Sequence, residues 1–337
     1  MLRRATAFYP LAVTVLFGLL VSLLPISPAL GDNIGACQGN TASSATLKLG
    51  GRPIDPNQIL LANGTQVCVD GGKKVNLISM SRTIIVSPNG TPTENGTALL
   101  TAMTTISNSN PSVDNPWLLK LEPGNYDLGA GSLTLLPYVD LEGSGDNNTV
   151  ISSTIASPGT LQAASHSETR FVQIINSGST TGTGVYVPAG STDVRFTHVT
   201  VISNSAIGNH YGILTADNSS SSGPVTVQES TISASGGSNS FSIYTGSKTT
   251  TTVQNSTVTT SGAANVSDAI VNYGTVTVLN SAVTTSGGAT SYGLVNAGTA
   301  RVGASQLSGS SAASVNLTLC PASFNGATFQ PLNANCQ

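Results

Sequence analysis

Short runs of alternating apolar and polar residues recur at regular intervals along the chain. In its last third, three segments align without gaps: VTVQESTISASG from Val225, TTVQNSTVTTSG from Thr251 and VTVLNSAVTTSG from Val276. Alternation with a period of two is typical of a short strand with one buried face. Hairpins of a sandwich rarely repeat the same residues every two dozen positions, whereas the coils of a solenoid do. The pattern therefore predicts parallel strands stacked coil upon coil.

Two columns of apolar residues follow this period, and their intervals shorten toward the C-terminus. The first column comprises Phe196, Val227, Val253, Val278 and Val302. The second column comprises Ile213, Ile243, Ile270 and Leu294. Inward side chains at these positions stack into a core that no single coil can bury alone. We expect an all-β fold, a single-stranded parallel β-helix with three short strands per coil, over residues 83–310.

A polar corner follows the first strand of each repeat. The position after that strand holds Glu229, Asn255, Asn280 and Ala304, and the next position holds Ser230, Ser256, Ser281 and Ser305. Asn and Ser tolerate bends, and they hydrogen-bond the local backbone or the same residue in the next coil. We interpret the two columns as structural ladders at a corner, with a binding strip as the alternative.

One segment departs from the strand pattern. After Thr93 and Glu94, apolar residues follow helical spacing at Ala98, Leu99, Ala102, Met103 and Ile106. This spacing predicts a single amphipathic helix near residues 94–107. Because an uncovered solenoid end exposes core and strand edges, we expect this helix to cap one end.

Composition agrees with a β-solenoid and excludes other classes. Of 337 residues, 8% are charged and 5% are aromatic, and 36 are Gly. A coiled coil or helical bundle is rich in Ala, Glu, Lys, Leu and Arg, and a disordered chain combines high net charge with few β-branched residues. The net charge of −3 gives no attraction to phosphate backbones, so we expect no nucleic-acid partner.

The N-terminal segment over 1–31 has the pattern of a secretory signal peptide. Arg3 and Arg4 precede an apolar run over 8–24, and the small residues that a signal peptidase reads lie in Pro28-Ala29-Leu30-Gly31. The alternative is an uncleaved membrane anchor, for which the run is short. We expect a protein that is secreted, periplasmic or at the cell surface, with no membrane contact after cleavage.

Four cysteines form two local pairs near the ends of the chain, Cys37 with Cys68 and Cys320 with Cys336. Four cysteines permit three connectivities, but an end-to-end bridge requires the termini of an elongated protein to meet. We expect two local disulfides, one in an N-terminal cap region over 32–82 and one in a C-terminal cap over 311–337. The cysteine spacing does not match a zinc site, and no cofactor is indicated.

Two stretches at the start of the predicted solenoid carry a family resemblance. They read TIIVSPNGTPTENGTALLTAMTTI and NPWLLKLEPGNYDLGAGSLTLLPYVDLEGSGDNNTVI, and they include the Pro123-Gly124-Asn125-Tyr126 and Gly143-Ser144-Gly145 turns. This region, residues 83–151, resembles the opening coils of the pectin lyase-like superfamily, particularly bacterial secreted proteins similar to pectinesterases. The resemblance implies a right-handed parallel β-helix. It implies little about chemistry, because turn and core residues are also kept by inert members.

The enzymatic signatures that this superfamily would imply are missing from the sequence. Pectinesterase-like catalysis implies aspartates in QDT-like and DFIFG-like strands and an arginine in an LGRPW-like segment, and none of these occurs. The aspartate clusters of polygalacturonases and the calcium-binding aspartates of pectate lyases are absent as well. Between residues 225 and 310 the only charged residues are Glu229, Lys248, Asp268 and Arg301.

One neighbourhood is rich in charge and is the candidate site: His166, Glu168, Arg170, Asp193, Arg195 and His198. The interval from Arg170 to Arg195 is close to one coil, so these groups can share a face and present themselves to an acidic or neutral sugar. His198 precedes Glu229 in the corner column, which predicts an exposed His–Glu pair. The alternative, which we favour, is a solvated face with ordinary ion pairs.

A second group of carboxylates comprises Asp140, Glu142 and Asp146. Three carboxylates can coordinate calcium, but the first two alternate with apolar residues and are expected simply to point outward. Tyrosines also recur at coil-like intervals, where they contact sugar rings or, more often, pack beside neighbouring turns: Tyr138, Tyr186, Tyr211, Tyr244 and Tyr292.

Together these observations predict a secreted or cell-surface β-helix protein without catalytic activity that binds a polysaccharide or a cell-surface glycan on a solenoid face. One alternative is a divergent pectinesterase-like or other polysaccharide-degrading enzyme with its site around residues 166–198. Another is an adhesin or a structural surface protein. The sequence does not determine the ligand or the oligomeric state.

Overall fold

The computed structural model describes residues 82–217, 222–309, 311–314, 318–333 and 336, together with four short strands nearer the N-terminus. The chain separates into two units, Met1–Leu77 and Ile78–Gln337. In the first unit, β1 (Lys48–Leu49) pairs antiparallel with β2 (Arg52–Pro53), and β3 (Val67–Val69) pairs antiparallel with β4 (Lys73–Val75). The predicted signal peptide, Cys37 and the side chain of Cys68 lie outside the described residues.

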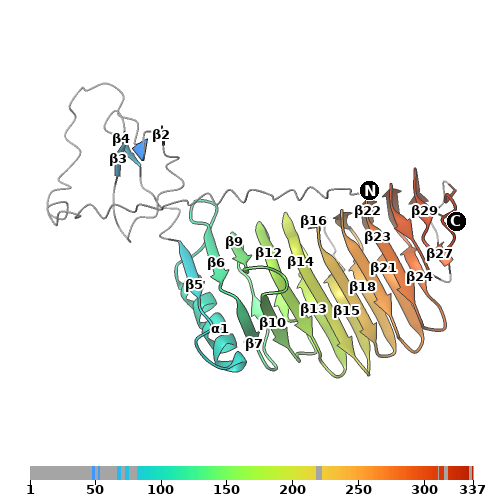
Figure 1. Ribbon diagram of the computed structural model, residues 1–337, viewed down its shortest axis with the longest axis horizontal. Helices are drawn as coiled ribbons and strands as arrows, with labels where there is room; N and C mark the ends of the chain where they lie inside the picture. The colour runs from blue at the N-terminus through green and yellow to red at the C-terminus, as the bar shows by residue number, and fades with distance from the viewer. Residues whose placement is uncertain are drawn as a thin grey trace, which may run out of the picture. The chain divides into compact units, whose positions relative to one another are not determined.

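Three stacks of short parallel strands form the second unit, and each strand is hydrogen-bonded to its counterpart one coil later (Figure 1). Stack 1 comprises β5 (Thr83–Val86), β6 (Trp117–Leu121), β9 (Val139–Glu142), the first halves of β12 (Ser167–Asn176) and β14 (Val194–Ser205), β16 (Ser222–Gln228), β19 (Thr249–Gln254), β22 (Thr275–Leu279), β25 (Thr299–Gly303) and β28 (Thr318–Leu319). Stack 2 comprises β7 (Gly124–Asp127), β10 (Thr149–Ser153), the second halves of β12 and β14, β17 (Thr231–Gly236), β20 (Thr257–Ser261), β23 (Ala282–Ser286), β26 (Gln306–Leu307) and β29 (Phe324–Asn325). Stack 3 comprises β8 (Leu133–Thr134), β11 (Leu161–Gln162), β13 (Thr181–Val187), β15 (Asn209–Thr215), β18 (Asn239–Thr245), β21 (Val266–Asn272), β24 (Tyr292–Asn296) and β27 (Ser311–Ser314). The prediction of a parallel β-helix with three strands per coil is confirmed.

The two predicted apolar columns form the core of the solenoid. Phe196 pairs in register with Val227, and the same position continues through the next three coils. Ile213 and Ile243 begin an equivalent column in stack 3. Every residue of both columns is fully buried. Each buried aliphatic side chain contributes about 1.5–3 kcal/mol to stability. Because these side chains are buried by the coils above and below, the columns stabilise each coil through contact with its neighbours.

A sharp corner joins stack 1 to stack 2 in successive coils. The corner residue adopts a left-handed backbone conformation, with φ between 48 and 55° at Phe171, His198, Glu229, Asn255, Asn280 and Ala304. Asn tolerates this conformation better than most residues, which explains its place in the column. The serine that follows each corner from Glu229 onward carries the hydrogen bonds between coils. Ser230 N donates to Ser256 Oγ at 3.2 Å, and Ser256 N donates to Ser281 Oγ at 3.1 Å.

The predicted capping helix is present as α1 (Pro92–Asn108). Thr91 and Glu94 form a reciprocal capping box at its start, and Leu99 and Ile106 are among its buried residues. The helix contacts β5, β7 and β8, which are the first strands of the three stacks (Figure 1). It therefore covers one end of the solenoid, as its apolar spacing predicted.

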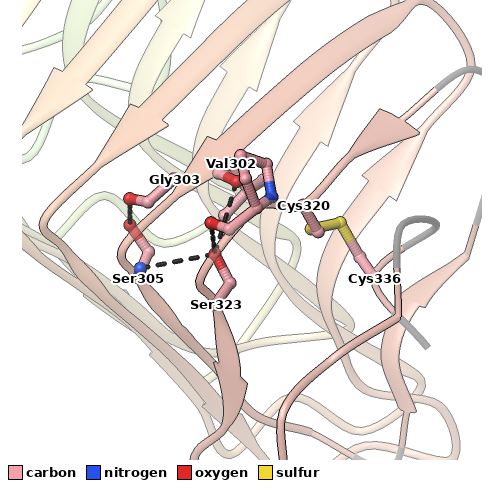
Figure 2. The surroundings of a disulfide bond; sticks show 7 residues. Val302, Gly303, Ser305, Cys320, Ser323 and Cys336 are labelled. Atoms are coloured by element: carbon pink, nitrogen blue, oxygen red, sulfur yellow. Dashed lines mark hydrogen bonds between the residues drawn. A yellow bond between two sulfur atoms is a disulfide. The ribbon is translucent and has the colours of Figure 1, made fainter.

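The opposite end of the solenoid holds a disulfide between Cys320 and Cys336, whose Cα atoms are 5.3 Å apart. Figure 2 shows this disulfide beside the last step of the serine ladder, where Ser305 N donates to Ser323 Oγ at 3.4 Å. The expected C-terminal disulfide is thus present. Among the described residues, no helix has the length and apolar character needed to cross a membrane.

Candidate functional site

The charged residues predicted as a site lie on or beside consecutive strands of stack 1. Their side chains alternate with buried residues, so those on the strands share the outer face. Arg195 is not the register partner of Arg170, because the register pairs Arg195 with Glu168. Unlike charges therefore lie side by side. Brought together here are Asp140 and Glu142 of β9, His166 before β12 with Glu168 and Arg170 on it, and Asp193 before β14 with Arg195 and His198 on it.

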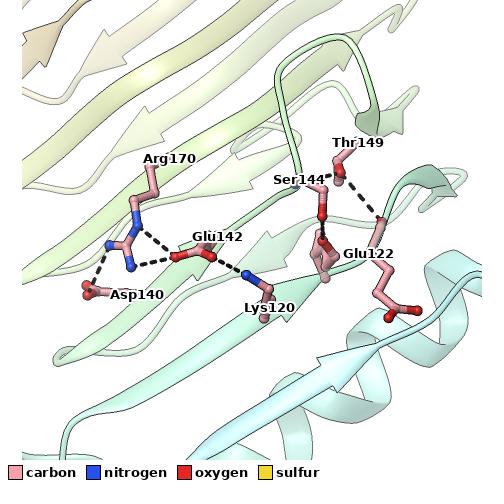
Figure 3. A network of polar contacts seen from close by, with 8 residues as sticks. Lys120, Glu122, Asp140, Glu142, Ser144, Thr149 and Arg170 are labelled. Carbon is pink, nitrogen blue, oxygen red and sulfur yellow. Dashed lines mark hydrogen bonds and ion pairs between the residues drawn. The ribbon is translucent and has the colours of Figure 1, made fainter. Parts of the chain in front are cut away.

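Arg170 is the centre of an ion-pair network across β6, β9 and β12 (Figure 3). Its Nη2 and Nε donate to Glu142 Oε2 at 2.8 and 3.0 Å, and its Nη1 donates to Glu168 Oε2 at 2.9 Å. Asp140 Oδ2 lies 3.6 Å from Nη1. Lys120 on β6 forms an ion pair with the other carboxylate oxygen of Glu142. The guanidinium of Arg170 thus forms ion pairs with three carboxylates, and these pairs connect the outer faces of neighbouring coils.

Burial and ion pairing have opposite effects on the pKa values of the carboxyl groups in this network. Burial raises the pKa of Asp140, and the hydrogen bond from the Glu168 amide and the charge of Arg170 only partly offset that effect. Burial also opposes ionisation of Glu142, but hydrogen bonds from Lys120 and Arg170 outweigh it and lower the pKa of that carboxyl. Glu142 therefore remains ionised between its two cations.

The three carboxylates considered for calcium have separate partners. Asp140 and Glu142 face Arg170 and Lys120, whereas Asp146 accepts a hydrogen bond from Thr200 Oγ1 at 2.9 Å. Within the described part of the chain, no group of three His, Cys, Asp or Glu side chains is placed to hold a metal ion.

An open hollow of about 230 Å³ lies beside the network, lined by Asp140, His166, Ser167, Glu168, Asp193 and Arg195. Arg195 donates from Nε to Asp193 Oδ1 at 3.0 Å, and its side chain is 59% exposed. His166 Nδ1 lies 3.7 Å from Asp193 Oδ2, and the imidazole stacks on the Tyr138 ring with centroids 4.9 Å apart. Because the pair with Asp193 uses only Nε, the terminal nitrogens of Arg195 remain suited to a further acceptor.

The expected pair of His198 and Glu229 is present at the corner between stacks 1 and 2. His198 Nε2 lies 2.7 Å from Glu229 Oε2, and the imidazole stacks on Phe171 with centroids 5.1 Å apart. All three residues occupy the left-handed corner position of consecutive coils. The pair therefore links neighbouring coils in addition to being exposed to solvent.

A second candidate surface lies on the outer face of stack 3, and it was only partly visible in the sequence. Tyr211 stacks on Phe241 with centroids 5.3 Å apart, and Tyr244 meets Tyr211 edge-on at 5.9 Å. Tyr273 meets Tyr244 at 5.5 Å. We call these four side chains the aromatic strip. The tyrosines singled out in the sequence did not include Tyr273, and Phe241 is not a tyrosine. The contacts of both depend on the register of β15, β18 and β21.

Asp268 lies next to Phe241 in the register of stack 3 and also escaped the sequence reasoning. It is 6% exposed, and its Oδ1 accepts a hydrogen bond from Tyr292 N at 3.0 Å. Burial raises the pKa of this carboxyl, and the hydrogen bond from Tyr292 only partly offsets the effect. A signal was available, since Asp268 is one of only four charged residues between 225 and 310.

Comparison with known proteins identifies the fold. No family model matches the chain, and no curated protein matches its sequence significantly. Pectin methylesterase PemA from Erwinia chrysanthemi aligns with a TM-score of 0.52 at 12% identity, over 75% of this chain and 91% of that chain. A mutant pectin methylesterase in complex with hexasaccharide IV aligns with a TM-score of 0.50 at 12% identity, over 68% of this chain and 86% of that chain. The resemblance to pectin lyase-like β-helices is therefore confirmed for the fold.

Proposed function

We propose that this protein is a polysaccharide-binding β-helix that acts outside the cytoplasm, and that the hollow around Arg195 contacts the glycan. The observation that carries the proposal is an open polar concavity in which guanidinium, imidazole and carboxylate groups converge on one solenoid face. The terminal nitrogens of Arg195 suit the carboxylate of an acidic sugar, and the neighbouring acceptors suit its hydroxyls. Pectin methylesterases of the same fold, one with a bound hexasaccharide, support a glycan as the ligand.

The ion-pair network favours binding over acid–base catalysis. A general acid or base must reach a proton of the substrate. Here Glu142 is held between Lys120 and Arg170, and Glu168 also faces Arg170. These contacts occupy two carboxylates beside the hollow, and on this ground we place the enzyme second.

A location outside the cytoplasm is supported by the disulfide between Cys320 and Cys336. Such bonds persist in oxidising compartments and are rare where glutathione keeps thiols reduced. The predicted signal peptide over 1–31 leads to the same proposal, which secretion of the tagged full chain by a host cell would test.

Binding of hexagalacturonate by isothermal titration tests the hollow. Arg195→Ala should weaken binding about tenfold or more, which corresponds to ~1.4 kcal/mol, because a charge-assisted hydrogen bond to the sugar carboxylate is lost. The matched control is Arg301→Ala, which removes an exposed arginine from β25 of the same stack. Equal affinities of the Arg195→Ala and unaltered chains would contradict a role for the hollow.

Incubation of the purified chain with pectin and with a panel of glycans distinguishes the alternative functions. Release of methanol, unsaturated ends or new reducing ends from pectin, abolished by Arg195→Ala, would establish a divergent enzyme in place of a binding protein. Failure to bind any member of a panel of acidic and neutral glycans would favour a structural or adhesive role.

A further inference from the structure

We infer that the aromatic strip on the outer face of stack 3 is a second glycan-binding surface, which takes an uncharged polysaccharide chain. The inference rests on the proposed role in glycan binding but not on the hollow, because the strip belongs to β15, β18 and the turn after β21, whereas the hollow belongs to stack 1. The strip consists of Tyr211, Phe241, Tyr244 and Tyr273.

Ring orientation leaves aromatic surface available to a ligand. Tyr211 and Phe241 stack on each other with an interplanar angle of 28°, so part of each ring face is already covered. Tyr244 is turned by 89° relative to Tyr211 and breaks this stack. Tyr273 is tilted by 37° against Tyr244 and is 49% exposed. Tyr244 and Tyr273 therefore provide the accessible end of the strip, where the apolar face of a sugar ring can pack against aromatic carbon.

The strip follows the coil repeat across three coils. Tyr211 pairs with Phe241 in register between β15 and β18, and Tyr273 follows directly after β21 of the next coil. Adjacent strands in a sheet are about 4.8 Å apart. The rings therefore extend along the solenoid axis as a linear surface, which matches an extended chain better than a single small molecule.

The charged residues around the aromatic strip differ from those around the hollow. Asp217 acts electrostatically on Tyr244, and Asp268 lies beside Phe241 in the register. Among the described residues from β15 to β21, there is a single Lys or Arg, Lys248 in the turn after β18. The two carboxylates named above therefore outnumber it. A chain of uronic acids would bring further negative charge to this surface, whereas an uncharged glycan would not.

The tyrosine hydroxyls supply hydrogen bonds to such a ligand. Burial raises the pKa of Tyr244 to about 12, and the charge of Asp217 adds to the effect. Burial also raises the pKa of Tyr211. A tyrosine hydroxyl has an ordinary pKa of about 10 and is protonated at neutral pH with or without such a shift, so both hydroxyls can donate to sugar oxygens. An apolar ring with a polar edge is the combination that a sugar, with its apolar face and hydroxyl rim, requires.

The test measures binding of neutral xylohexaose and galactohexaose to the full chain by titration calorimetry. Tyr273→Ala and Tyr244→Ala should each weaken binding about tenfold or more, because a stacked ring is lost. Tyr244→Phe keeps the ring and should change the affinity less than Tyr244→Ala. Phe329→Ala removes a ring that is 74% exposed at the C-terminal end and serves as the matched control. Tyr273 lies in a turn, so its variant tests the strip even if Tyr244→Ala fails to fold.

The outcomes separate this inference from the proposed function. In an Arg195→Ala chain, tighter binding of xylohexaose than of hexagalacturonate supports an uncharged ligand at the strip. If glycan binding is lost in Arg195→Ala and unchanged in both tyrosine variants, the hollow is the glycan site and the strip inference is overturned. If no glycan binds the unaltered chain, the inference and the proposed function both fail.

Discussion

Single residues at the corner between stacks 1 and 2 have a strained backbone conformation, and their side chains contact the neighbouring coils. A left-handed conformation costs a residue other than Gly about 1–2 kcal/mol, with Asn and Asp least affected. Asn255 and Asn280 suit this position, whereas Phe171 and His198 do not suit it by backbone preference alone. Their rings stack on each other, and His198 pairs with Glu229. Side-chain contact thus offsets strain in the coils where the charged residues lie.

Buried His210 makes stability depend on pH. Its side chain is fully buried, with Nε2 2.9 Å from the Ile207 carbonyl oxygen. Burial lowers the pKa of His210, and the hydrogen bond to Ile207 only partly offsets this effect. As pH falls below about 6.5, the unfolded chain binds a proton that the folded chain excludes, so the free energy of unfolding decreases.

We therefore expect His210→Gln to reduce the loss of stability between about pH 8 and about pH 5. Urea denaturation at both pH values measures this difference for the unaltered and variant chains. Asp268→Asn provides a contrast of opposite sign in a lower range, because burial raises the pKa of Asp268 above its ordinary value of 3.8 and stability is lost as pH rises from there through the raised pKa. An unchanged pH dependence in His210→Gln would contradict the assignment.

At the scale of elements, the serine ladder fixes the register of successive strands. Each serine hydroxyl accepts from the backbone N–H of the preceding coil and donates to a carbonyl two residues earlier in its own coil. Ser256 Oγ, for example, accepts from Ser230 N at 3.2 Å and donates to Gln254 O at 2.7 Å. The ladder thereby satisfies polar backbone groups at a buried corner, where an unpaired N–H is costly.

Ser256→Ala should destabilise the protein by about 1–3 kcal/mol, because the buried Ser230 N–H loses this acceptor. Ser261→Ala is the matched control, since Ser261 lies on β20 of the same coil with a partly exposed side chain. Chemical denaturation compares the two. Equal effects of the two substitutions would show that the ladder does not stabilise the corner.

At the scale of the whole solenoid, each coil contacts only its neighbours, so the ends are the weakest part. α1 covers one end through contacts with β5, β7 and β8. At the other end the disulfide closes a segment with a sequence separation of 16 residues. In the loop-entropy model, a bond of this span contributes about 3 kcal/mol.

Reduction of the disulfide should loosen the C-terminal coils and leave the central coils intact. Hydrogen exchange should accelerate in β26 and β29, whereas β12 and β14 should keep their protection, because stability in a repeat protein is coupled between neighbours. A chain with both Cys320→Ser and Cys336→Ser controls for side effects of the reductant. A uniform rise in exchange along the solenoid would show that the coils unfold as one unit.

The candidate surfaces were less accessible to sequence reasoning than the fold. The charge-rich neighbourhood was found because its residues are concentrated in a chain with only 8% charged residues. The sequence did not reveal that Lys120 and Glu142 join Arg170, since they come from β6 and β9 of earlier coils. It also did not assemble the aromatic strip, whose members are spread along the chain from Tyr211 to Tyr273.

The sequence by itself determined the architecture: the coil period, the inward columns, the capping helix and the serine corner. The helix is set by its own local apolar spacing, whereas the other features repeat, because burial of one face of each strand forces the same residue types to recur at each coil. Only the tertiary structure decided which outward side chains meet. The register brings residues of different coils together at about 4.8 Å, and a small shift in register changes every outward partner, as the pairing of Glu168 with Arg195 shows. Outward residues bury little apolar surface, so burial does not enforce their pattern in the sequence.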